Sequence, residues 1–160
     1  VITLPGHGWL GVAVEEFIYL MNSFNQQIKR FNPRLGNCFL EDLICFPTQD
    51  KIEHICSFDV FILAFCSELV KYEDETAVHC LDTMSQTWTR LDNLEGSAKN
   101  MVSFRKEKHL YILQRSGNLW EICSDGCKSI NLKLMVVLWN GNHNVNGAIC
   151  YNDALFIHGQ

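Results

Sequence analysis

The chain has 160 residues, enough for one domain with its own core, and its 48% hydrophobic and 19% charged residues are typical of a globular protein. A net charge of −5 argues against a nucleic-acid partner, because phosphate binding needs a basic stripe. The longest apolar runs, 60–66 and 132–139, are too short to cross a bilayer as helices, and the chain opens without the basic and apolar regions of a secretory signal. We therefore expect no nucleic acid, no membrane partner and no secretory signal.

The eight cysteines lie mostly inside apolar stretches, and their spacing forms no compact framework. The sequence also lacks an Asn-x-Ser/Thr glycosylation acceptor. Both observations favour buried thiols in a reducing compartment over a secreted disulfide protein. We expect a cytoplasmic protein, with association with the cytoskeleton or residence in the nucleus left open.

Four β-hairpins are predicted along the chain, each an apolar strand, a tight polar turn and a second apolar strand. Their first strands are expected at 12–14, 54–58, 101–104 and 148–151, and their second strands at 16–20, 59–63, 108–112 and 154–158. An aromatic residue recurs in the second strands at spacings of 42, 50 and 45 residues: Tyr19, Phe61, Tyr111 and Phe156. This spacing is typical of propeller blades, so we expect the four aromatic residues to be structurally equivalent.

Two further strands are predicted after each of the first three hairpins. The third strands are expected at 28–31, 78–81 and 118–122, and the fourth at 38–40, 88–91 and 127–132. Asp, Asn, Pro and Gly between them favour turns for backbone reasons. Helix signals are weak by comparison, so each repeat is predicted to be a four-stranded antiparallel unit, with Trp88 and Trp120 packed between units.

Two segments carry a family resemblance. Leu81-Asp82-Thr83 with Trp88 seven residues on, and Phe31-Asn32-Pro33, resemble the kelch repeat of β-propellers, although the Gly-Gly pair of that repeat is missing and only Gly159 supplies a glycine. The resemblance covers residues 1–160 as a partial kelch β-propeller, with repeats at about 9–46, 54–94, 100–138 and an incomplete 147–160. It implies an all-β fold of about three four-stranded antiparallel blades plus the inner hairpin of a fourth. The chain is then expected to be part of a longer ring.

The resemblance also implies where a partner would bind. Kelch propellers bind through one face, where the loops 22–27, 67–76 and 114–118 and the connections 47–53, 93–100 and 140–146 are expected to emerge. Aromatic and Arg anchors among polar groups fit a protein-binding surface better than a catalytic pocket. The candidate partner-binding residues on this face, beside Trp139, are Phe24, Tyr72, Glu73, Asp74, Glu75, Arg115 and His143.

Catalytic and metal motifs are missing from the sequence. Cys123 and Cys127 form a C-x₃-C pair, but no second pair with ligand spacing follows it. The sequence contains no P-loop, G-x-S-x-G, G-x-G-x-x-G or H-E-x-x-H motif. We expect no enzyme, no metal and no cofactor; a kelch-like copper oxidase or sialic-acid epimerase would need Tyr and His ligands from a complete ring.

The resemblance leaves two functional expectations. The first is a protein-interaction module, the substrate-recognition propeller of a cullin-type ubiquitin ligase adaptor, whose partner is a ubiquitylation substrate or another protein. The cullin would be recruited through regions outside these residues. The alternative is a cytoskeletal, actin-associated kelch scaffold protein.

Overall fold

The computed structural model describes residues 4, 6–35, 40–43, 45–68, 74–124 and 129–159. These residues form β-strands, turns and loops and contain no helix, which confirms the all-β prediction. All strand pairs are antiparallel, and three of the sheets contain a continuous run of four strands.

The sheets follow one another in chain order. Sheet 1 consists of β1 (Trp9–Val14), β2 (Phe17–Asn22), β3 (Ile28–Phe31) and β4 (Glu41–Asp42). Sheet 2 consists of β5 (Lys51–Phe58), β6 (Phe61–Ser67), β7 (Glu75–Asp82) and β8 (Thr87–Arg90), and β9 (Leu94–Glu95) pairs with the start of β7. Sheet 3 consists of β10 (Val102–Lys106), β11 (His109–Leu113), β12 (Asn118–Ser124) and β13 (Ile130–Val137). The strands β14 (Val145–Tyr151) and β15 (Ala154–Gly159) form a separate two-stranded sheet, the last hairpin.

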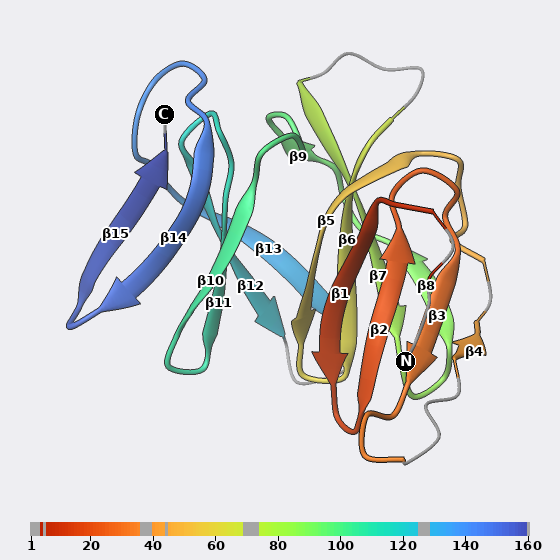
Figure 1. Cartoon of the computed structure of the whole chain (residues 1–160). Coiled ribbons are helices and arrows are strands. Elements are labelled where there is room, and N and C mark those ends of the chain that lie inside the picture. Colours follow the sequence, from red (N-terminus) through yellow and green to blue (C-terminus); the bar gives the residue numbers. More distant parts are fainter. Residues whose placement is uncertain are drawn as a thin grey trace.

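The four units stand side by side and pack through their faces, with sheet 1 at one end and the last hairpin at the other (Figure 1). Three apolar cores fill the junctions between consecutive units. β6 contributes to two of them: Phe61, Leu63 and Phe65 point to the core shared with sheet 3, whereas Ile62, Ala64 and Cys66 point to the core shared with sheet 1. Because successive side chains of a strand alternate between its faces, a strand covered on both sides is apolar throughout.

The four hairpins share one turn geometry. Each has a two-residue loop whose first residue has a positive φ: Glu15 at 53°, Asp59 at 53°, Glu107 at 56° and Asn152 at 47°. A positive φ at this residue is what two-residue hairpins of types I′ and II′ require, so the four hairpins share one class of turn.

This common turn corrects one prediction. Counted from the turn, the third residue of the second strand is Tyr19, Leu63, Tyr111 and Phe156, so Phe61 is not equivalent to the other three aromatic residues. Phe61 lies two residues earlier, directly after the turn. The prediction was wrong because a shift of two residues keeps a side chain on the same face, and both positions are apolar.

The fourth strands also differ from the prediction. β4 is formed by Glu41 and Asp42, whereas Leu40 lies before it and residues 36–39 lie outside the described part of the chain. Charge explains the difference: Asp42 pairs with Lys29, and Glu41 pairs with Arg30 at 2.7 Å across the strands. The strand β13 runs to Val137, beyond the predicted end at Leu132.

Candidate partner-binding site

The candidate site lies at the end of the sheets opposite the two-residue hairpin turns. We call this end the loop face: residues 23–27, 45–50, 74, 91–101, 114–117 and 138–144. Its loops connect the second strand of a unit to the third, and its linkers run from one unit to the next, both near the top of Figure 1. The sequence analysis predicted that these segments emerge together.

Each described loop is hydrogen-bonded to the linker that follows it. Gln26 Nε2 donates to the Asp50 carbonyl at 3.2 Å, and the Gly96 amide donates to the Asp74 carbonyl at 2.6 Å. The Arg115 carbonyl accepts from Trp139 Nε1 at 2.9 Å and from the His143 amide at 2.8 Å. The same connection at three junctions fixes the loop face before any partner binds, which lowers the entropic cost of binding.

Phe24 lies at the junction of sheets 1 and 2. Its side chain is 59% exposed and is flanked by the His7 ring at 5.6 Å and the Lys51 ammonium at 5.5 Å from its ring. An exposed aromatic ring held by its neighbours is a rigid contact surface that costs little side-chain entropy on binding.

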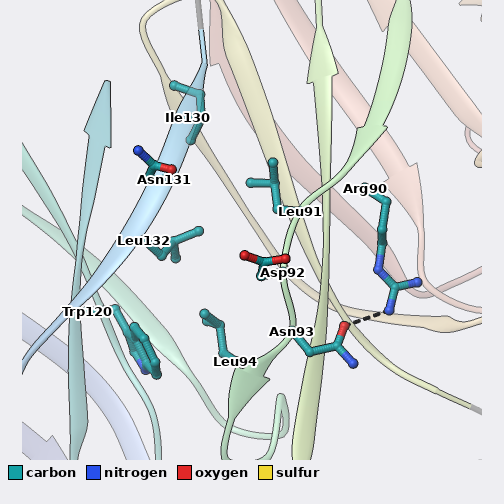
Figure 2. A pocket seen from close by; sticks show the side chains of 9 residues that line it. All are labelled: Arg90, Leu91, Asp92, Asn93, Leu94, Trp120, Ile130, Asn131 and Leu132. Carbon is teal, nitrogen blue, oxygen red and sulfur yellow. Dashed lines mark hydrogen bonds between the residues drawn. The ribbon is translucent and has the colours of Figure 1, made fainter. Parts of the chain in front are cut away.

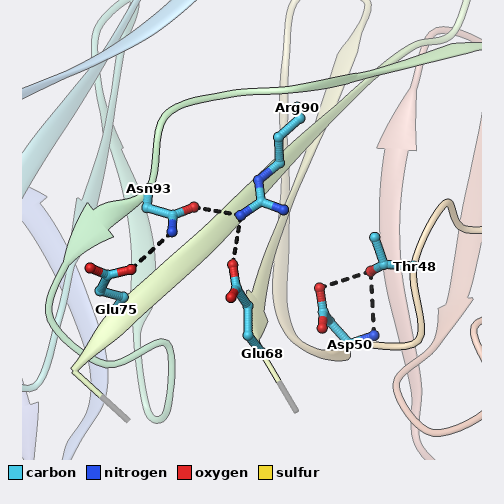
Figure 3. Close-up of polar contacts among 6 residues, drawn as sticks. All are labelled: Thr48, Asp50, Glu68, Glu75, Arg90 and Asn93. Carbon is cyan, nitrogen blue, oxygen red and sulfur yellow. Dashed lines mark hydrogen bonds and ion pairs between the residues drawn. The ribbon is translucent and has the colours of Figure 1, made fainter. Parts of the chain in front are cut away.

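Asp74 and Glu75 lie at the junction of sheets 2 and 3, where both are exposed. A chain of polar contacts begins at Glu75: its carboxylate accepts from Asn93 Nδ2 at 3.0 Å, Asn93 Oδ1 accepts from Arg90, and Arg90 also binds Glu68 (Figure 3). Tyr72 and Glu73, the other candidates of this loop, lie outside the described residues.

Arg115 and His143 lie at the junction of sheet 3 and the last hairpin, where the structure brings them together. The His143 ring is exposed and meets the Trp139 ring edge to face at 5.7 Å. Arg115 Nε is shielded from solvent without a hydrogen-bond partner among the described residues. The candidate residues thus occupy three successive junctions along the loop face and do not form one cluster.

Sequence reasoning missed Glu95, Ser116, Asn118 and Asn140, which lie between the second and third of these places. A cavity of about 490 Å³ opens there, and Asp74, Glu95, Ser116, Asn118, Trp139 and Asn140 are among its lining residues. Glu95 was missed because β9 is only two residues long and carries no apolar pattern. The Asn-rich linker 140–144, next to Trp139, was the feature of the sequence that could have indicated this cavity.

A second cavity, of about 310 Å³, lies where the outer strands of sheets 2 and 3 diverge (Figure 2). Leu91, Leu94, Trp120 and Leu132 line it and also belong to the packing between these sheets. Trp120 Nε1 donates to buried Gln114 Oε1 at 2.8 Å. Trp88 packs against the core of sheets 1 and 2, so the predicted packing role of both tryptophans is confirmed.

Three buried thiols lie in the cores of sheets 1 to 3. Burial raises the pKa of Cys56 to about 12 and that of Cys80 to about 11, and it raises the pKa of Cys66 as well. Thiols with such pKa values stay protonated and are poor nucleophiles. Among the described residues no group of three or more His, Cys, Asp or Glu side chains could hold a metal ion, and Cys127 lies outside them.

The described residues contain no helix long and apolar enough to span a membrane. No protein-family model matches the chain, and no curated protein matches it. Among solved structures, that of YjhT is similar over 96% of this chain and 72% of the YjhT chain, at 10% sequence identity and a TM-score of 0.48.

Proposed function

We propose that the chain forms three blades and the inner hairpin of a fourth blade of a kelch-type β-propeller, and that its loop face binds a protein partner. Three face-packed four-stranded sheets with a shared hairpin turn support the propeller. One observation carries the binding role: at three junctions the loops are hydrogen-bonded to the linkers, and exposed Phe24, Asp74 and His143 stand on this fixed frame.

The partner class follows from the kelch resemblance of Phe31-Asn32-Pro33 and Leu81-Asp82-Thr83. We propose a non-enzymatic cytoplasmic role as the substrate-recognition propeller of a cullin-type ubiquitin ligase adaptor. The buried, protonated thiols of Cys56 and Cys80 are unsuited to thiol catalysis. An actin-associated kelch scaffold is the second candidate, because it would use the same loop face.

Charge reversal on the loop face tests the binding role. In the full-length protein, replacing Asp74 and Glu75 together by Lys, or Arg115 by Ala, should reduce recovery of partners in quantitative proximity labelling by about thirtyfold, since a truncated Arg anchor can cost about 2 kcal/mol of binding free energy. The melting temperature of the Asp74/Glu75 variant should stay nearly unchanged, because exposed charges contribute little to folding.

The matched control reverses the same number of charges at the opposite end of the sheets, at Glu15 and Glu16, and should leave partner recovery intact. Loss of partners in the control alone would move the binding site to the hairpin turns. A cullin among the recovered proteins would favour the ligase adaptor, and actin or an actin-bound protein would favour the scaffold.

A further inference from the structure

Within the described part of the chain, the cavity of about 490 Å³ on the loop face carries negative charge without a compensating cation. Asp74 and Glu95 line it, and neither carboxylate has an ion pair or hydrogen bond within the described part of the chain. In the pairing of β7 with β9, Glu75 stands directly opposite Glu95. Like charges opposite each other destabilise a strand pair, so this arrangement does not serve the fold.

Arg90, a cation of the neighbouring strand β8, is already occupied. Its guanidinium donates to Glu68 and to Asn93 at 2.6 Å each and is not bonded to Asp74 or Glu95 (Figure 3). Among the described residues that line the cavity there is no Lys, Arg or His. The cavity therefore suits a cationic group and disfavours an anion.

The remaining walls fit a cation as well. Trp139 is one of the lining residues, and an aromatic ring attracts cations through its quadrupole. Asn118 and Asn140 add amide groups, and the Ser116 hydroxyl oxygen, shielded from solvent, has no hydrogen-bond partner among the described residues. Carboxylate and amide oxygens accept hydrogen bonds from an ammonium or guanidinium group.

The walls are also held in place. The Asn118 side chain donates to the Glu95 carbonyl at 3.2 Å, and the Leu138 amide donates to the Gly117 carbonyl at 2.9 Å. A fixed site binds a charged group more strongly than flexible surface charges do, because less side-chain entropy is lost on binding.

We propose that this cavity receives a Lys or Arg side chain of a partner peptide, an inference that rests on the proposed protein-binding function. An organic cation is favoured over a metal ion, because no described group of three or more His, Cys, Asp or Glu side chains is close enough to bind one. The partner segment is therefore basic, in keeping with the net charge of −5 of this chain.

Calorimetry with an acetylated tri-arginine amide tests the proposal on the full-length protein at about 150 mM salt. Glu95→Gln or Asp74→Asn should each weaken binding at least about fivefold. Glu16→Gln removes the same charge at a hairpin turn and should change the affinity less than twofold. A tri-glutamate peptide should not bind.

Undetectable tri-arginine binding would overturn the proposal, as would equal weakening by Glu95→Gln and Glu16→Gln, which would show only long-range attraction. In either case the proposed protein-binding function would still hold if the loop-face variants reduced partner recovery. If those variants left partner recovery unchanged as well, both the proposed function and the cation site would be rejected.

Discussion

At the scale of single residues, His54 shows what the packing between sheets 2 and 3 requires. Its Nε2 lies 2.9 Å from Ser103 Oγ of the neighbouring sheet. Burial lowers the pKa of His54 from 6.5 to about 4. The junction therefore accommodates a neutral imidazole and disfavours its protonation.

We expect acid to destabilise the fold through His54. Between pH 6.5 and about 4 the unfolded chain binds a proton that the folded chain does not, so this contribution to stability is present above pH 6.5 and is lost as the pH falls toward 4. Lowering the pH from 7.5 to 5 should cost about 2 kcal/mol at this site, measurable by urea unfolding. His54→Gln should show a smaller pH dependence; an equal one would assign the effect to other groups.

Trp88 tests the packing of the outer strand of sheet 2. Its ring meets Phe46 edge to face at 5.0 Å and packs against the core of sheets 1 and 2. Because the side chain is only partly buried, Trp88→Ala should cost about 2–3 kcal/mol, below the range for a fully buried Trp. Nearby Met84 is 77% exposed, so Met84→Ala should change the unfolding free energy by less than about 0.5 kcal/mol.

At the scale of elements, Gly117 shows how the loop between β11 and β12 meets the linker after β13. Its φ is +90°, and a Cβ atom there would lie 2.6 Å from the Trp139 carbonyl oxygen. An alanine at this position would meet both an unfavourable backbone conformation and the backbone of the linker.

Alanine substitutions at three glycines distinguish backbone strain from steric clash, and thermal or urea unfolding measures their effects. Gly117→Ala should be the most destabilising, by at least about 2 kcal/mol. Gly141 has a φ of +85° with open space around it, so Gly141→Ala should cost about 1 kcal/mol from the backbone alone. Gly147 has neither feature, and Gly147→Ala should be nearly neutral. Equal costs at residues 117 and 141 would contradict the close approach to Trp139.

The hairpins were predictable from sequence because alternating or continuous apolar runs around short polar turns depend on local information alone. The register of each strand and the strand it pairs with depend on the rest of the chain. The sequence could not distinguish Phe61 from Leu63, and it favoured apolar 38–40 over the charged pair Glu41 and Asp42 that forms β4. On the loop face, Asp74, Arg115 and His143 stood out by residue type, whereas Glu95 acquires its place only through pairing with Glu75.

At the scale of the whole molecule, the position of each sheet sets how well it is covered. Sheet 2 has neighbours on both faces, whereas the last hairpin has one, and its Ile149, Tyr151 and Phe156 are exposed. Phe156 occupies the place that Tyr19 and Leu63 fill in the earlier units, where those side chains face the following sheet.

Because the sheets are packed against neighbours to different extents, we expect different parts of the chain to unfold locally at different rates. In the isolated 160-residue chain, amide hydrogens of β6 should exchange with solvent only when the whole chain unfolds, whereas those of β15 that are hydrogen-bonded to β14 should exchange through detachment of one hairpin, orders of magnitude sooner. Native-state exchange followed by mass spectrometry across denaturant concentrations would measure this gradient. A uniform exchange rate would mean that the chain opens as one unit. Graded rates would mean that the last hairpin unfolds locally while sheet 2 stays folded.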